Sequence, residues 1–330
     1  MKRMLSGIKP TGRLTLGNYI GAIKHFIEYQ DEYEMYVFVA NLHAITVPID
    51  RQELKRDTKD LVALYLACGL DPNKTTIFMQ TDILEHGYLA FVLNCHTYMG
   101  ELSRMTQYKD KMQKEKDGNH NVGLFTYPTL MAADILMYKA DYVPVGEDQK
   151  QHVELTRDIA IRFNNKHGET FTVPEPIIAK VGSRIMSLSH PEKKMSKSEE
   201  DGDKGCIYLL DDPKLARKKI MSAVTDLDTE VRYDEEKKPG ISNLLSIYCA
   251  LTNKSFEEAE EHFKGYNYGN FKKEVADEVE NFLTDLQTKY RSIIESGMID
   301  KVLEDGANKA RYQARKMLGK VFHKLGLEYK

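Results

Sequence analysis

Residues 4–21 read MLSGIKPTGRLTLGNYIG, and this stretch decides the fold. Met4 to Ile8 is a short apolar run, which predicts a strand, and the proline and glycine that follow it predict a turn. From Asn18 onward, apolar residues recur at helical spacing. A strand that leads through such a turn into a helix offers backbone N–H groups and the positive end of a helix dipole to an anion. An ordinary tight turn explains this segment equally well when it is taken alone.

The first half of the chain repeats this alternation of strand and helix. Residues 35–40 form a continuous apolar run, which is typical of a strand buried on both faces. Residues 51–68 are amphipathic and are followed by Gly69, a typical helix C-cap, and residues 77–79 predict a third strand. Strands separated by helices of this length predict right-handed βαβ units. We therefore expect an α/β fold with a Rossmann-type parallel sheet.

The second half of the chain has a different character, because helical periodicity dominates after Asp211. The predicted helices cover residues 212–223, 241–251, 255–264, 271–294 and the chain from 298 onward. The helix over 271–294 carries a full apolar stripe, as a buried bundle helix does. We predict a Rossmann-type catalytic domain over residues 1–200 and a helical domain over residues 201–330. As an alternative to lying within the helical domain, the last helix packs back on the catalytic domain.

Composition sets limits on the function. A chain of 330 residues exceeds the usual size of a single core, which agrees with two domains. The net charge of -3 excludes a uniformly basic nucleic-acid coat but allows a local basic patch. The 4 cysteines form no CxxC pair, and we expect neither a metal site nor a disulfide framework. No apolar run is long enough for a membrane segment or a signal peptide, so we expect a cytoplasmic protein.

A lysine segment, residues 193–198, reads KKMSKS and precedes an acidic loop that contains glycine. Lys194 and Lys197 lie three positions apart with hydroxyl groups nearby, and such a pair is suited to hold a polyphosphate. A charge run is more often a solvated surface. That alternative would be preferred if the segment stood alone.

Together, the two segments resemble the signatures of the class I aminoacyl-tRNA synthetases. Residues 194–198 match the KMSKS loop of that class letter for letter. Residues 15–18 resemble its HIGH element, with asparagine in place of the second histidine, and this variant is similar to the bacterial tryptophanyl-tRNA synthetases. The resemblance extends over nearly the whole chain. It departs from many bacterial relatives at Lys9, where they carry glutamine, and at Asn41-Leu42.

A third segment, residues 127–136, reads YPTLMAADIL and predicts a helix with proline near its start. Tyr127, Met131 and Asp134 then share one face of the helix. An indole N–H is a donor only, so an ionised carboxylate is its natural partner. A single aspartate is more commonly satisfied by local backbone. The resemblance implies instead that Asp134 recognises the indole nitrogen of the substrate.

A fourth segment, residues 145–149, reads VGEDQ and precedes a helix that we expect to begin near Gln149. Asp148 is suited either to cap this helix or to hold a ribose hydroxyl. The resemblance implies that the segment contacts the adenosine ribose. It also implies that Gln149 and Tyr127 hold the α-ammonium group of the amino acid, and that the backbone of Ile185 contacts adenine.

The resemblance implies two substrate sites, which we predict as follows. The ATP site comprises Lys9, Pro10, Thr11, Gly17, Asn18, Gly146, Glu147, Asp148, Ile185, Lys194, Met195, Ser196, Lys197 and Ser198. The tryptophan site comprises Asp134, Tyr127, Met131 and Gln149. The residues expected to act in catalysis are Lys194, Lys197, Thr15 and Asn18. We expect His43 to be a packing or interface residue.

The implied reaction has two steps. The carboxylate of L-tryptophan attacks the α-phosphate of ATP and pyrophosphate leaves, so catalysis consists of positioning and of stabilising phosphate charge. The aminoacyl group then passes to the terminal ribose of tRNA(Trp). We expect Mg²⁺ to be bound through the phosphates and water, and the lysine loop to close during the reaction. The family is homodimeric, which implies a homodimer here.

The last stretch of the chain, residues 307–330, is strongly basic. Its basic residues are Lys309, Arg311, Arg315, Lys316, Lys320, Lys324 and Lys330, and Glu328 is its one acidic residue. Such a helix is usually a solvated face. In a synthetase it favours contact with RNA, and the resemblance implies that the helical domain binds the anticodon of the tRNA.

Three other functions compete with this interpretation. A tyrosyl-tRNA synthetase shares the fold and both signatures, but it predicts further polar partners for a phenol where this chain has Met131. A simpler nucleotidyltransferase with a HIGH-type element predicts neither the KMSKS loop nor a helical half. A non-catalytic RNA-binding paralogue predicts the loss of an active-site lysine, and both Lys194 and Lys197 are present.

Overall fold

A five-stranded parallel sheet forms the centre of the computed structural model, which describes residues 1–114, 121–178, 184–195 and 204–328. In spatial order the strands are β3 (Thr75–Met79), β2 (Glu34–Val39), β1 (Arg3–Ile8), β4 (Tyr142–Val145) and β5 (Glu175–Ile178). All neighbouring strands are parallel, which confirms the predicted α/β class. The chain passes from β1 to β2 on one side and later places β4 on the other side. Ligands of open α/β sheets bind outside the carboxyl ends of the strands at such a reversal.

β2 shows that the sheet is buried on both faces, as its apolar run predicts. Met35, Val37 and Val39 belong to one hydrophobic core, and Tyr36 and Phe38 belong to the other. This follows from the alternation of side chains along a strand. The first core is completed by α4 (Arg51–Cys68) and the second by α8 (Val122–Met137) and α9 (Glu147–His167).

The remaining helices of the first half are short. They are α1 (Leu16–Asn18), the π turn η1 (Tyr19–Ile23), α2 (Lys24–Tyr29), α3 (Asn41–Ala44), the 3-10 turn η2 (Gln80–Asp82), α5 (Glu85–Asn94), α6 (Met99–Ser103) and α7 (Thr106–Lys114). The predicted bounds of α4 are confirmed, and Gly69 ends it with φ at +113°. β4 and β5 were not predicted, because each is 4 residues long and contains a proline, which weakens the strand signal.

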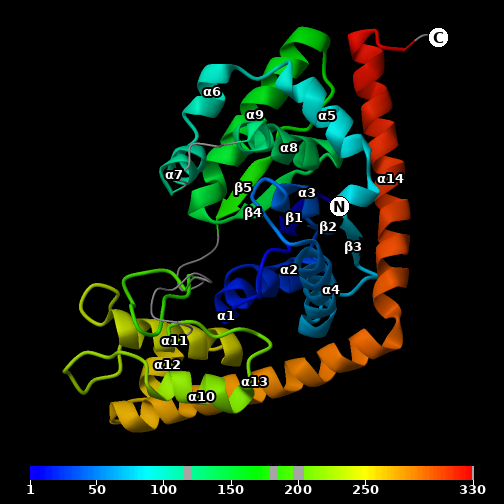
Figure 1. Ribbon diagram of the computed structural model, residues 1–330. Coiled ribbons are helices and arrows are strands. Elements are labelled where there is room, and N and C mark those ends of the chain that lie inside the picture. Colours follow the sequence, from blue (N-terminus) through cyan, green and yellow to red (C-terminus); the bar gives the residue numbers. More distant parts are fainter. Residues whose placement is uncertain (115–120, 179–183, 196–203, 329–330) are drawn as a thin grey trace.

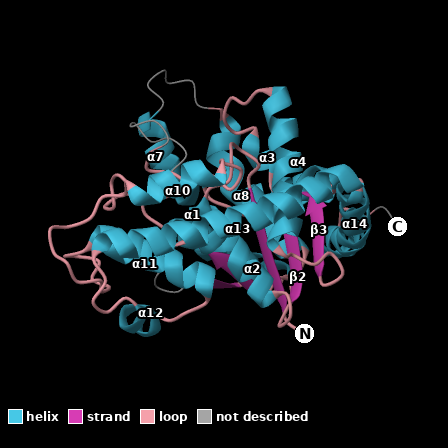
Figure 2. Cartoon of the chain, turned by 90° about the horizontal axis from the view of Figure 1, so that it is seen from below, coloured by secondary structure: helices cyan, strands magenta, loops and turns pink. Residues whose placement is uncertain are grey.

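All five predicted helices of the second half are present. They are α10 (Pro213–Met221), α11 (Pro239–Thr252), α12 (Phe256–His262), α13 (Tyr268–Ser296) and α14 (Met298–Leu325). The predicted domain boundary at residue 200 lies outside the described residues. Figure 2 shows α13 passing from the helical part toward the sheet, and it packs on α10, α11 and α4. Among the described residues, the helices are either too short or too polar to cross a membrane.

α14 runs along the edge strand β3, at the right of Figure 1. A Cβ atom built on Gly306 would lie 1.7 Å from the carbonyl oxygen of Ile77, so only glycine fits at this point. Ala307, Ala310 and Ala314 are buried in the same core and keep the contact close along the helix. The helix therefore covers an edge of the sheet that would otherwise be open to pairing.

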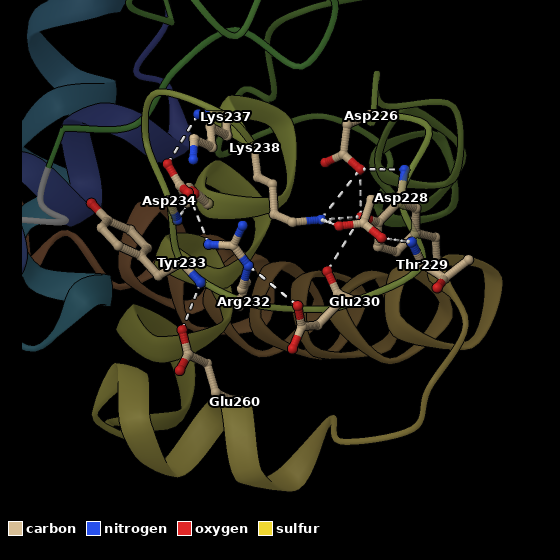
Figure 3. A network of polar contacts seen from close by, with 12 residues as sticks. Asp226, Asp228, Thr229, Glu230, Arg232, Tyr233, Asp234, Lys237, Lys238 and Glu260 are labelled. Atoms are coloured by element: carbon tan, nitrogen blue, oxygen red, sulfur yellow. Dashed lines mark hydrogen bonds and ion pairs between the residues drawn. The ribbon is translucent and has the colours of Figure 1, made fainter.

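The segment between α10 and α11 is held by a buried lysine, which Figure 3 shows. Lys238 is 2% exposed, and its Nζ lies 2.7 Å from Asp228 Oδ2 and 3.4 Å from Asp226 Oδ1. Tyr268, the first residue of α13, donates a hydrogen bond to Asp226 Oδ1 at 2.6 Å. Burial opposes the charge of Lys238, but its hydrogen bonds with Asp228 and Tyr268 raise its pKa above the ordinary value. The network fastens this segment to α13.

Candidate active site

A capping box organises the start of α1, directly after the turn that follows β1. Thr15 Oγ1 accepts a hydrogen bond from the N–H of Asn18 at 3.1 Å, and Asn18 Oδ1 accepts one from the N–H of Thr15 at 3.0 Å. Thr15 is 2% exposed, so its hydroxyl serves this cap. The half-buried Asn18 makes no hydrogen bond through its Nδ2 to the described part of the chain. The Asn18 amide is therefore available to donate to a ligand.

The turn before this cap faces α4. Lys9, Pro10 and Gly12 line a cavity of about 290 Å³ together with Asp57 and Asp60 of α4. Gly12 has φ at +67°, and its N–H donates to Asp57 Oδ2 at 2.7 Å. Thr11, between them, donates its N–H to the carbonyl of Lys9 at 2.9 Å. The carboxylate of Asp57 thus fixes the turn that carries the predicted ATP residues.

A second segment, residues 184–195, folds onto the first. The N–H of Met195 donates to the carbonyl of Ile185 at 3.0 Å, and both side chains are buried. The ideal Cβ position at Gly17 lies 3.6 Å from Ile185 Cβ and 3.7 Å from Met195 Cβ. The HIGH-like and KMSKS-like segments therefore meet at Gly17. Lys194 is exposed beside this contact, and Ser196, Lys197 and Ser198 lie outside the described residues.

Asn243 of α11 joins this second segment to the helical part, and the sequence analysis missed it. Its side chain accepts a hydrogen bond from the N–H of Met186 and donates one to the carbonyl of Met186, each at 2.8 Å. Asn243 is 4% exposed. The available signal was an amide within an apolar helical run, since a buried amide requires partners.

α8 carries Tyr127, Met131 and Asp134, as the third segment predicts. The expectation that Pro128 stands near the start of this helix is wrong. Asn121 accepts a hydrogen bond from the N–H of Leu124 and starts the helix at Val122, so Pro128 lies nearly two turns inside it. The hydroxyl of Tyr127 lies 2.8 Å from His152 Nε2, and burial raises the pKa of Tyr127.

Asp134 is 1% exposed and lies at the centre of a buried hydrogen-bond network. Its Oδ1 is 2.8 Å from Gln80 Nε2 and 2.5 Å from His86 Nδ1, and its Oδ2 is 2.7 Å from His43 Nε2. Burial opposes ionisation, but the hydrogen bonds from His43 and His86 lower the pKa of Asp134 below its ordinary value. Asp134 is therefore an ionised acceptor, as recognition of an N–H group requires.

The three partners of Asp134 were not predicted as site residues. Gln80 directly follows β3, and His43 lies in the short helix after β2. His86 is the second residue of α5, shortly after Gln80. The signal that could have found them is their place after the carboxyl ends of adjacent parallel strands, where a ligand site is expected. His43, expected to be a packing or interface residue, is indeed buried but contacts the predicted specificity residue directly.

α9 starts at the carboxyl end of β4, on the other side of β1 from these residues. It begins at Glu147 with Gly146 as its N-cap, so the alternative in which Asp148 caps this helix is wrong. Asp148 lies in the first turn and accepts a hydrogen bond from Gln107 Nε2 at 3.0 Å. Gln149 Nε2 lies 3.4 Å from the same carboxylate. The first turn of α9 thus presents exposed polar groups at the sheet reversal.

Comparisons with known proteins agree with this arrangement. A family model described as tRNA synthetases class I (W and Y) matches residues 1–284. The chain is 53% identical over 327 residues to the tryptophan–tRNA ligase of Caldanaerobacter subterraneus subsp. tengcongensis, with 99% of each chain covered. It is similar to the crystal structure of tryptophanyl-tRNA synthetase from Mycoplasma pneumoniae, with a TM-score of 0.91, 39% identity and 99% and 98% of the two chains covered.

A further structural relative contains ligands. It is the tryptophanyl-tRNA synthetase of Campylobacter jejuni complexed with ADP and tryptophan. The TM-score is 0.81 at 35% identity, and the match covers 98% of this chain and 99% of the other.

Proposed function

Since this chain belongs to the class I tRNA synthetases of the W and Y group, we propose that it activates L-tryptophan with ATP and then transfers it to tRNA(Trp). The observation that carries this proposal is the meeting of its two signature segments at Gly17, on the same edge of the sheet as Asp134. The two segments supply the groups proposed to bind phosphate, Asn18 from one and Lys194 from the other. Asp134 supplies the acceptor for an aromatic ring N–H.

The first step needs positioned charge rather than a general base, because the carboxylate of the amino acid is already a nucleophile. It attacks the α-phosphorus in line, and the bond to the departing pyrophosphate breaks. In this proposal Asn18 Nδ2 and the exposed residue Lys194 hold phosphate oxygens. The same role is proposed for Lys197, which lies outside the described residues. Thr15 acts by fixing Asn18 through the capping box.

Magnesium fits this site through the ATP phosphates. Among the described residues, no group of three or more His, Cys, Asp or Glu side chains could hold a metal ion. The proposal therefore binds Mg²⁺ through the substrate and not through protein ligands. Mg²⁺ usually keeps several waters and binds substrate phosphates, whose charge it neutralises. Lys194 would share that charge with the ion, which explains a lysine rather than a carboxylate at this position.

The tRNA is proposed to contact the helical part and α14. In α14, Arg311 donates to the carbonyl of Asp82 and Arg315 pairs with Glu85, so these two basic residues hold the helix to the sheet domain. Lys309 and Lys316 are exposed on the outer side. α10 adds Lys214 and Lys218 beside a shallow hollow. Such surface lysines suit the phosphate backbone of an RNA.

We further propose that the enzyme is a homodimer that pairs through α5. Leu84, the N-cap residue of this helix, and Tyr88 and Phe91 within it recur at helical spacing and are 75%, 63% and 71% exposed. Tyr98 and Met99 extend the apolar surface, with exposures of 63% and 72%. We take these exposed apolar side chains as an interaction surface. An isologous contact with a second copy would bury it.

The proposed activity is tested by ATP–pyrophosphate exchange with each amino acid separately. Tryptophan-dependent exchange is expected, because Asp134 accepts an N–H and its neighbour on α8, Met131, offers a thioether and no polar partner for a phenol. Tyrosine-dependent exchange, or none, contradicts the proposal.

Lys194→Ala should slow exchange by roughly 100-fold, as loss of one charged transition-state contact does. Its neighbour gives the control, since Lys193→Ala should leave the rate within about twofold.

A further inference from the structure

The acceptor capacity of Asp134 is almost fully used by the protein. An ionised carboxylate offers about four lone-pair sites, two on each oxygen. Gln80 and His86 occupy both sites of Oδ1, and His43 occupies one site of Oδ2. Gln80 cannot be reversed, because its Oε1 accepts from the N–H of Leu42 at 3.0 Å and its Nε2 must therefore face Asp134. A single acceptor site on Oδ2 remains for a ligand.

The direction of the hydrogen bonds beyond His86 follows from the same logic. An ionised carboxylate only accepts, so His86 Nδ1 donates to it. The other nitrogen, Nε2, lies 2.7 Å from the hydroxyl of Tyr138. In the neutral tautomer that donates through Nδ1, this nitrogen accepts from the hydroxyl, and we assign that tautomer here. The chain therefore runs from Tyr138 through His86 to Asp134.

This chain is isolated from solvent. Tyr138 and His86 are both 0% exposed. The ring of His86 is surrounded by Phe38, Phe78 and Tyr138, with centroid distances of 6.3, 6.3 and 5.5 Å. Water cannot replace a lost donor in such a place, so loss of the His86 hydrogen bond would leave one acceptor site of Asp134 Oδ1 unsatisfied, with Gln80 as the remaining donor.

We propose that His86 and Tyr138 are positioning residues that hold Asp134 in one orientation, so that its last acceptor site receives the ring N–H of the amino-acid substrate. The two residues thereby determine the preference for an indole over an aromatic ring of the same shape without an N–H. The proposal rests on the proposed function, since it concerns the tryptophan site. His86 and Tyr138 are proposed to act through Asp134, without touching the substrate themselves.

The test compares two substrates in variants of His86. L-Tryptophan and L-3-benzothienylalanine have nearly the same shape, but sulfur replaces the N–H in the second. His86→Leu removes the donor to Asp134. We expect kcat/KM for tryptophan in pyrophosphate exchange to fall about 10- to 100-fold, as for a lost hydrogen bond to a charged group. The value for the analogue should change less than about threefold, and so should the KM for ATP.

Two further variants separate positioning from packing. His86→Asn places an amide N–H₂ near the position of Nδ1 and should restore most of the preference for tryptophan. Tyr138→Phe removes one oxygen, preserves the ring, and should reduce the preference about 3- to 10-fold. Because the chain contains no tryptophan, the indole fluorescence of the ligand can report its binding directly.

Several results would overturn the proposal. Equal losses with both substrates in His86→Leu would show a purely structural role, and so would a loss in His86→Asn as large as in His86→Leu. If His86→Leu does not fold, an unchanged substrate preference in Tyr138→Phe is sufficient to reject the proposal. A wild-type enzyme that exchanges with tryptophan but fails these comparisons leaves the proposed function intact. A wild-type enzyme that does not use tryptophan rejects the proposed function itself.

Discussion

At the scale of the residue, Asp134 combines two demands that usually conflict. Burial at 1% exposure removes competing water, yet the three hydrogen bonds from His43, His86 and Gln80 keep the carboxylate ionised. In folded proteins a buried carboxylate without such partners takes up a proton instead. Burial opposes ionisation of Asp134, but the hydrogen bonds from His43 and His86 lower its pKa, so the group is an acceptor at neutral pH.

Asp134→Asn should separate tryptophan use from ATP use. The amide replaces one acceptor oxygen with a donor, which then faces another donor in the buried network. We expect kcat/KM for tryptophan to fall roughly 100-fold or more, while the KM for ATP stays within about threefold. Steady-state exchange kinetics measure both constants. The control is Asp141→Asn, which makes the same change at the amino end of β4 and should alter neither kcat/KM for tryptophan nor the KM for ATP. Equal loss of both substrates would mean that Asp134 is structural.

Prediction from sequence reached Asp134 but not its partners, for a physical reason. Tyr127, Met131 and Asp134 lie on one helix, whose period places them on one face without any knowledge of the fold. His43 and His86 reach Asp134 across sequence separations of 91 and 48 residues, which only the strand order determines. The cap of α9 was predicted wrongly for a similar reason. The helix starts after Gly146 and not after Asp148, because its start depends on where β4 ends.

At the scale of the element, α14 and β3 fit together through the absence of a side chain. Gly306→Ala should gain about 1 kcal/mol from helix propensity, but the new methyl group collides with the backbone of Ile77. We expect a net loss of about 1–3 kcal/mol in the free energy of unfolding, the range for overpacking. Urea denaturation measures the change.

Gly319 provides the matched control on the same helix. A Cβ atom at Gly319 meets nothing within 4 Å, so Gly319→Ala should stabilise the protein by up to about 1 kcal/mol. If Gly306→Ala leaves the free energy of unfolding unchanged or raises it as Gly319→Ala does, the contact between α14 and β3 does not constrain position 306.

The network around Lys238 makes a prediction about pH. Hydrogen bonding from Lys238 lowers the pKa of Asp228; for Asp226, burial opposes the charge, but the hydrogen bond from Tyr268 lowers the pKa. Depressed folded-state pKa values contribute stability above the ordinary value of 3.8, and this contribution is lost as pH falls through the lower folded values. Lys238 has a raised pKa, so its contribution is complete below 10.5.

Lys238→Met should therefore lower the free energy of unfolding by about 1–3 kcal/mol at neutral pH, because Asp226 loses its buried partner. The difference from wild type should be constant from neutral pH down to about 4 and should shrink below that, as pH falls through the lowered pKa values of Asp226 and Asp228. Lys237→Met, at the exposed neighbouring lysine, should change stability by less than about 0.5 kcal/mol. A difference that does not vary over this pH range would contradict the role of the two aspartates.

At the scale of the whole molecule, the apolar face of α5 predicts the assembly state. Phe91→Glu places a charge in the centre of this face, where an isologous contact would bring two charges together. We expect sedimentation to show a dimer for the wild type and a monomer for the variant. Tyr312→Glu introduces the same charge at another exposed aromatic, on α14, and should remain dimeric. A wild-type monomer would reject the proposed contact.

The fold as a whole was largely predictable, because its signals are local. β1 and β2 are apolar runs, and α4 has a capping residue at each end. The exceptions are β4 and β5, where Pro144 and Pro176 interrupt the strand signal but the paired neighbours still form the sheet. The sequence offered the packing of α14 on the catalytic domain only as an alternative, since a basic helix is usually a solvated face, whereas Arg311 and Arg315 bind the helix to residues 82 and 85.

The position of α14 has a consequence for biosynthesis. The ribosome makes β3 early, whereas the helix that covers it is made after every other element of the described chain. Until α14 emerges, the nascent polypeptide carries a formed sheet with an open strand edge, which is a template for pairing with other chains. A stalled ribosome would therefore expose an aggregation-prone folding intermediate, the sheet with its β3 edge uncovered. Chaperone binding during translation is expected to last until α14 has been synthesised and docked.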